Sequence, residues 1–141
     1  MIAYIDASVL LRLVLGQPNA LPEWDQIERG ASSVLVTTEG LRSLDRLRLR
    51  TTVSDRDIAR WRAAIFALAA SLELIEINSA VLDRAAQPMP TELGTLDAIH
   101  LSTALLWKEM TGKDVVMATH DRALAIAAEA HGMMVVGVPR S

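Results

Sequence analysis

Short apolar runs rich in β-branched residues alternate along the chain with longer segments in which apolar positions recur with the period of a helix. The short runs predict buried β-strands at residues 2–5, 33–37, 74–77, 114–119 and 133–138. The longer segments predict helices at residues 8–15, 22–29, 39–50, 96–108 and 122–131, with two more opened by caps at Ser54 and Ser79.

This alternation predicts the fold class. Strands that are apolar nearly throughout are typical of parallel sheets, because helices cover both of their faces. The helix at residues 96–108 is apolar almost all round, which indicates a buried position. The stretch QPMPTELGT, residues 87–95, is the only clear loop of any length, and no linker, repeat or low-complexity tract divides the chain. We therefore expect one α/β domain over residues 1–141, with a parallel sheet flanked by helices on both faces.

Composition narrows the classes of function. The chain of 141 residues is 51% hydrophobic and has no Cys, which excludes disulfides, thiolate zinc sites and a cysteine nucleophile. Asp6 and Arg12 interrupt the N-terminal apolar stretch, so we expect no signal peptide. No stretch approaches the roughly 20 apolar residues of a membrane span, and we expect a soluble cytoplasmic protein. The net charge of −3 argues against a protein that coats nucleic acids, but not against an enzyme that holds phosphates through bound metal.

Carboxylates follow three of the predicted strands. Asp6, Glu39 and Asp121 each come at or shortly after the end of a different strand. Because ligands of open α/β sheets bind at the carboxyl ends of the strands, we expect these side chains to lie near one another at that edge. A fourth acid, Asp97, starts the apolar helix, where an ionised carboxylate is costly unless it is paired or bound to a metal. Taken singly, an acid after a strand is more often a helix cap, and this alternative applies to Asp6 and Asp121.

Four neighbouring carboxylates would repel one another. Two unit charges about 4 Å apart cost about 4 kcal/mol at an effective dielectric constant of about 20. At least one carboxylate would therefore bind a proton at neutral pH unless a cation compensates. Carboxylate oxygens suit Mg²⁺ or Mn²⁺. Zinc is disfavoured, because the chain has no Cys and its His residues are scattered.

The order IDAS, TTEGLR, TLDAIHLSTAL and VVMATHDRAL resembles the PIN-domain ribonucleases, and most closely the VapC-type toxins of bacterial type II toxin–antitoxin systems. The resemblance extends over essentially the whole chain. It implies a five-stranded parallel sheet and an endoribonuclease that hydrolyses RNA with Mg²⁺ or Mn²⁺. It also implies that four acids form the metal site and are catalytic, and here they are Asp6, Glu39, Asp97 and Asp121. Of these, Asp6, Asp97 and Asp121 would hold the metal, and Glu39 would orient either the attacking water or a second metal.

The resemblance further implies partners and supporting residues. RNA would be the substrate, with tRNA and rRNA as candidates, a cognate antitoxin would restrain the toxin, and the toxin would form a homodimer. Ser8 lies two positions after the first acid and Thr119 two positions before the last, and we expect both to support the site. Gly40 departs from the family pattern, in which an aliphatic residue usually follows the glutamate. This departure leaves the placement of Glu39 open.

Other side chains have two interpretations. Arg42, Arg46 and Arg50 form one ridge of the helix that Glu39 opens, and they either contact RNA phosphates or lie on an ordinary solvated face. For His100, on the buried helix, a hydrogen-bonded role in the interior is favoured over metal ligation.

Alternative functions come from three classes. A PIN nuclease could process RNA as a housekeeping enzyme. A receiver-like signalling domain also gathers acids at strand ends, but it needs a lysine at the carboxyl end of a strand. The only lysines are Lys108, in a predicted helix, and Lys113, before a predicted strand. A non-catalytic interaction module is disfavoured because all four acids are present.

Overall fold

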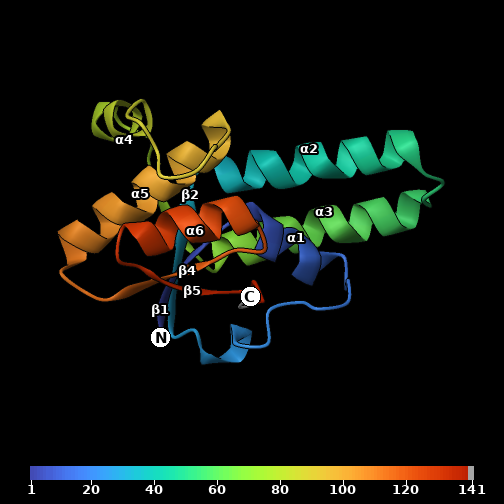
Figure 1. The fold of residues 1–141 in the computed structure, drawn as a ribbon. Coiled ribbons are helices and arrows are strands. Elements are labelled where there is room, and N and C mark those ends of the chain that lie inside the picture. The colour runs from blue at the N-terminus through green and yellow to red at the C-terminus, as the bar shows by residue number, and fades with distance from the viewer. Residues whose placement is uncertain (140–141) are drawn as a thin grey trace.

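The structure is a computed structural model that describes residues 1–139, and within them it contains one five-stranded sheet (Figure 1). The strands are β1 (Ile2–Ile5), β2 (Arg29–Ser33), β3 (Glu73–Ile75), β4 (Val115–Ala118) and β5 (Met134–Val136). All neighbouring strands pair in parallel, in the order β3-β2-β1-β4-β5, so β1 lies in the centre. The predicted α/β class with a five-stranded parallel sheet is confirmed.

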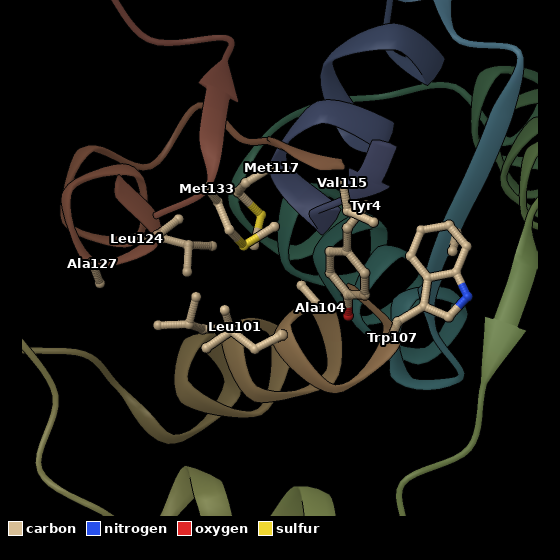
Figure 2. Close-up of a cluster of buried hydrophobic side chains, with 12 residues drawn as sticks. Tyr4, Leu101, Ala104, Trp107, Val115, Met117, Leu124, Ala127 and Met133 are labelled. Carbon is tan, nitrogen blue, oxygen red and sulfur yellow. The ribbon is translucent and has the colours of Figure 1, made fainter. Parts of the chain in front are cut away.

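Helices cover both faces of the sheet. Within the described residues they are α1 (Ala7–Val14), α2 (Leu35–Arg50), α3 (Asp55–Ala70), α4 (Ser79–Ala85), α5 (Thr95–Thr111) and α6 (Arg122–Ala130). Because side chains of a strand alternate between faces, β1 contributes to two clusters. Tyr4 packs with Leu101 of α5 and Leu124 of α6 (Figure 2). Ala3 and Ile5 pack on the other face, in a cluster with Val9 of α1.

The helices α2 and α3 form an antiparallel hairpin that projects beyond the sheet (Figure 1). The predicted cap of α3 is confirmed, because the Ser54 hydroxyl accepts a hydrogen bond from the Asp57 amide at 3.1 Å. Gly40 lies within α2 and is buried against α3. A Cβ atom at this position would lie only 3.3 Å from two side-chain atoms of Ile65. The glycine therefore allows the two helices to approach closely.

The second strand was predicted at the wrong residues. The apolar run at residues 33–37 lies mostly in the first turn of α2, where Val36 is buried against Leu44 and Ile65. The strand is instead the small-residue segment RGASS, and its Ser32 hydroxyl donates a hydrogen bond to the Ile5 carbonyl at 2.6 Å. A short apolar run fits a buried helix as well as a buried strand, and tertiary packing decided between them.

The helix predicted at residues 22–29 is also wrong. Only a 3₁₀ turn, η1 (Trp24–Gln26), forms there, and residues 15–28 make a second long connection besides the predicted loop at 87–95. Trp24 and Ile27 pack against the cluster of Ala3 and Ile5, so their apolar character serves the sheet and not a helix stripe. The cap of α4 is Asn78 instead of Ser79, because the Asn78 side chain accepts from the Val81 amide.

The remaining boundaries differ from prediction by a few residues at most. Helix α5 ends at Thr111 and is closed by Gly112, whose positive φ of 65° suits a glycine. Within residues 1–139, no helix combines the length and the apolar character needed to cross a membrane.

Candidate active site

The four predicted acids line one cavity of about 390 Å³. Its walls come from α1, from α2 and from the N-terminal ends of α5 and α6. Larger cavities lie beside α6 and β5, with about 490 Å³, and between α4 and α5, with about 480 Å³, but none of the four acids lines either of them. The fold thus brings together carboxylates from four segments that are far apart in the sequence.

Asp6 follows the central strand β1 and is only 4% exposed. Its backbone amide donates a hydrogen bond to the Ala118 carbonyl of β4 at 3.0 Å, so the backbone of Asp6 is held by the sheet. One side-chain oxygen, Oδ2, accepts from the Ser8 hydroxyl at 2.7 Å and from the Thr119 hydroxyl at 2.9 Å. These hydroxyls in turn accept from the amides of His120 and Asp121, each at 3.0 Å. Ser8 and Thr119 therefore join the exits of β1 and β4 and orient the Asp6 carboxylate.

Asp121 acts as a helix cap, whereas Asp6 does not. The Asp121 Oδ1 atom accepts from the Leu124 amide at 2.8 Å and caps α6, so this acid has the structural role that its position suggested. Asp6 stands at the equivalent place before α1, yet its side chain makes no capping hydrogen bond. Capping therefore does not explain a buried carboxylate at Asp6.

Asp97 lies in the first turn of α5 and is half-buried. Burial, followed by the charges of Asp6 and Asp121 and a smaller contribution from Glu39, raises the pKa of Asp97 to about 6, against the opposing effect of His100. The raised pKa of Asp97 thus reflects the repulsion expected among the four acids. At neutral pH the carboxylate is held in its charged form at a cost.

Glu39 reaches the cavity by a different route from the predicted one. Strand β2 ends at Ser33 and α2 begins at Leu35, so Glu39 projects from the second turn of a helix and not from a strand exit. Gly40 lies inside α2 and not at its start, so it does not affect how the helix begins. Glu39 is nevertheless among the residues that line the cavity.

His100 and Tyr4 form a buried hydrogen-bonded chain with Glu39. The His100 Nε2 atom lies 2.5 Å from Glu39 Oε1, and its Nδ1 atom lies 2.7 Å from the Tyr4 hydroxyl. Burial disfavours the charged imidazole, but the hydrogen bond and charge of Glu39, with Asp6 and Asp97, outweigh it and raise the pKa of His100. The interior role favoured for His100 agrees with this geometry.

The sequence interpretation missed Tyr4. A signal was present, because Tyr4 is the only tyrosine of the chain and falls in an apolar strand. A buried tyrosine hydroxyl needs a hydrogen-bond partner, and a polar partner was therefore to be sought near β1.

Two of the three predicted arginines line the cavity, Arg42 and Arg46. Arg42 also pairs with Asp45 at 2.8 Å, and Arg46 donates to the Ser43 hydroxyl at 2.9 Å. Arg50, at the end of α2, is not among the lining residues. The basic ridge therefore flanks the acids along one wall.

The donor atoms of the cavity fit a hard divalent cation. All four acids offer carboxylate oxygens, which suit Mg²⁺ or Mn²⁺, and a cation would relieve the repulsion that raises the pKa of Asp97. Among residues 1–139, however, no three Asp, Glu or His side chains already lie in an arrangement that could hold a metal ion. A cation would have to draw the acids closer together than they lie here, so the predicted cluster has the right chemistry without being preformed.

Comparison with known proteins identifies the family. The PIN domain family matches residues 3–131. Ribonuclease VapC46 of Mycobacterium tuberculosis is 33% identical to this chain, over 94% of it and 95% of the relative.

Solved structures share the fold. A toxin–antitoxin complex from Klebsiella pneumoniae matches with a TM-score of 0.66 and 17% identity, over 98% of this chain and 96% of the other. FitAcB from Neisseria gonorrhoeae matches with a TM-score of 0.66 and 18% identity, over 95% of this chain and 96% of the other. VapBC-5 of M. tuberculosis, from the VapBC family of toxin–antitoxin systems, matches with a TM-score of 0.57 and 15% identity, over 95% and 96%. The chain therefore belongs to the PIN-domain family and has a VapC-type ribonuclease as a full-length relative.

Proposed function

We propose that this chain is an endoribonuclease that hydrolyses phosphodiester bonds in RNA with Mg²⁺ or Mn²⁺ and acts as the toxin of a toxin–antitoxin pair. The observation that carries the proposal is the single cavity in which Asp6, Glu39, Asp97 and Asp121 meet. The family and the ribonuclease relative support the reaction type.

Asp6, Asp97 and Asp121 would hold the cation. When bound, Mg²⁺ or Mn²⁺ lowers the pKa of a water molecule and polarises the scissile phosphate. The protein prepares these acids in different ways. Ser8 and Thr119 fix the Asp6 carboxylate through one of its oxygens, and Asp121 uses Oδ1 to cap α6.

Glu39 is the acid that we assign to the attacking water. It accepts a hydrogen bond from a buried imidazole, so its carboxylate is held at the cavity wall. From there it can orient water and accept its proton as the water oxygen attacks phosphorus. The bond from phosphorus to the 3′-oxygen breaks, and the leaving oxygen takes a proton from solvent. The products carry a 5′-phosphate and a 3′-hydroxyl.

Arg42 and Arg46 are the phosphate contacts that we expect beside the acids. RNA is polyanionic and the acids repel it, whereas guanidinium groups match phosphate geometry. Both arginines line the same cavity as Glu39. Their position supports a substrate strand that runs along α2. Arg50 would contact a strand only if it continued toward the end of that helix.

The biological role is proposed from relatives. Similar structures are named as toxin–antitoxin complexes, which supports a cognate antitoxin as partner. A homodimer and a tRNA or rRNA substrate rest on the resemblance to VapC-type proteins. An RNA substrate would place the protein in the cytoplasm.

Purified protein should cleave single-stranded RNA in the presence of Mg²⁺ or Mn²⁺ and leave 5′-phosphate ends, and Asp97→Asn should abolish cleavage. Chelation should stop the wild type. Millimolar metal should raise the melting temperature by mass action on the folded state, by less in Asp97→Asn. The exposed Asp83 of α4 provides the matched control, Asp83→Asn, which should behave as the wild type.

The toxin role is tested in cells. Expression of the wild type should arrest growth, Asp97→Asn should not, and co-expression of the cognate antitoxin should relieve the arrest. Cleavage in vitro without growth arrest would favour a housekeeping nuclease. Absence of both cleavage and a metal-dependent shift in melting temperature would sink the assignment.

A further inference from the structure

A chain of three side chains crosses from the centre of the sheet to the cavity. It begins at Tyr4 of β1, passes through His100 of α5 and ends at Glu39 of α2, with separations of 2.7 Å and 2.5 Å. Tyr4 and His100 are 0% exposed, whereas the Glu39 side chain is 17% exposed. Only the last member therefore meets solvent, and the other two support it from behind.

The hydrogens of this chain can be assigned from the acceptors. An ionised carboxylate can only accept, so Nε2 of His100 carries a proton and donates it to Glu39. In the neutral imidazole Nδ1 then lacks a hydrogen and accepts from the Tyr4 hydroxyl. A tyrosine hydroxyl keeps its hydrogen at neutral pH and can donate it. In the protonated imidazole, which the raised pKa of His100 favours, Nδ1 instead donates to the Tyr4 hydroxyl. In both forms Nε2 donates to Glu39.

The same imidazole separates two of the acids. His100 Nε2 lies 4.0 Å from Asp6 Oδ1, on the side away from the Ser8 and Thr119 hydroxyls that hold Oδ2. A glutamate side chain on a helix has several rotamers, and like charges would drive Glu39 away from the other carboxylates. A donor fixed between Glu39 and Asp6 opposes that movement. The ring itself is held by an edge-on contact with Tyr4.

We propose that His100, oriented by Tyr4, is the positioning residue that holds the Glu39 carboxylate in the cavity. This inference rests on the proposed nuclease function, in which Glu39 acts on the attacking water. His100 touches neither water nor substrate and acts only through Glu39. Tyr4 acts one step further back, by fixing which nitrogen of the ring faces the acid.

The kinetic test uses three substitutions of the chain. His100→Leu should lower kcat by roughly 100-fold with little change in KM, because a small misplacement of a reacting group can cost that much. His100→Gln should restore part of kcat, since its amide can donate to Glu39. Tyr4→Phe should lower kcat less than His100→Leu. Ser102→Ala, a buried polar position on the same helix, is the matched control and should retain kcat.

A double-substitution cycle separates positioning from general structure. If His100 acts through Glu39, His100→Leu should cause no further loss in a Glu39→Gln background. Additive losses would overturn the proposal. If His100→Leu fails to fold, His100→Gln and Tyr4→Phe carry the same cycle, and unchanged kcat in both would equally overturn it.

A spectroscopic readout is independent of cleavage. Proton NMR of the metal-free protein should show a slowly exchanging imidazole N–H signal that is lost in His100→Gln and shifted in Glu39→Gln. Absence of the signal, or a signal that Glu39→Gln leaves in place, would refute the hydrogen bond. If the wild type cleaves no RNA while this signal is present, the proposed function is wrong, but the hydrogen bond between His100 and Glu39 is confirmed.

Discussion

At the scale of single residues, the raised pKa of Asp97 links the site to the stability of the protein. An acid whose pKa is higher in the folded than in the unfolded state binds protons preferentially in the folded state. Its contribution to stability is fully present below the unfolded pKa of about 4 and is lost as the pH rises through about 6. The metal-free protein therefore bears a cost at Asp97 at neutral pH.

Asp97→Asn should remove this cost. Without metal, the variant should be more stable than the wild type at pH 7, by on the order of 1 kcal/mol once solvent screening of this half-buried group is considered. The difference should shrink as the pH falls through about 6 and vanish below the unfolded pKa of about 4, where the aspartate is protonated in both states. Urea unfolding of both proteins across this pH range measures it, and a destabilised variant at pH 7 would show that the carboxylate has a structural role.

Single residues also show where sequence reasoning reached the site and where it stopped. Asp6 and Asp121 were found because strand ends meet at one edge of a parallel sheet, and Asp97 because an acid in an apolar helix needs a reason. Glu39 was predicted at a strand exit; it projects from a helix instead, and it lines the same cavity. Its bond to His100 joins residues 61 positions apart, and no local pattern encodes such a contact.

At the scale of elements, the close approach of α2 to α3 explains why a glycine stands at position 40. Ile65, fully buried in α3, occupies the space that a side chain at position 40 would need. The space beside the α2 backbone at position 40 is thus filled by an aliphatic side chain of the neighbouring helix. Glu39 is the residue before Gly40 in the sequence. The packing of α2 against α3 therefore determines where Glu39 lies relative to the sheet.

Gly40→Val should therefore destabilise the protein by about 1–3 kcal/mol, as overpacked cores do. Ile65→Ala alone should also destabilise it, by leaving a cavity. The double variant adds as many side-chain carbon atoms as it removes. Its loss of stability should therefore be smaller than the sum of the losses in the two single variants. Thermal unfolding of the four proteins provides the comparison, and strictly additive effects would contradict the packing described.

The elements show the same limit on prediction. The strands β1 and β4 and the helices α3, α5 and α6 were predicted to within a few residues, because long periodic segments and clear caps are local signals. Strand β2 was missed because its sequence, RGASS, has almost no apolar character. It forms because it lies beside β1, and a Cβ at Gly30 would meet Leu72 at 2.8 Å. Only the assembled sheet contains that information.

At the scale of the whole molecule, the charges are unevenly distributed. The chain carries a net charge of −3, yet seven of its cationic residues are arginines between positions 42 and 62, in the α2–α3 hairpin. If RNA is the substrate, as proposed, its long-range attraction would be weak and its binding would depend on the local field of this hairpin.

Arg42→Gln with Arg46→Gln should weaken RNA binding without lowering stability, since the exposed pair of Arg42 with Asp45 contributes little. Removing each arginine–phosphate interaction should reduce the dependence of log affinity on log salt by about 0.7 for a single strand. Fluorescence anisotropy at several salt concentrations measures this slope. Arg84→Gln, on α4 and paired with Glu109, is the matched control, and an equal effect there would indicate only a general loss of charge.

The central place of β1 means that the two halves of the site do not open together. The Asp6 amide is bonded into the ladder between β1 and β4, and such interior bonds exchange with solvent only when the sheet itself unfolds. Glu39 belongs to a hairpin that projects beyond the sheet (Figure 1), and a local fluctuation can release it while the strands stay paired. We therefore expect Glu39 to leave and re-enter the cavity without global unfolding of the protein.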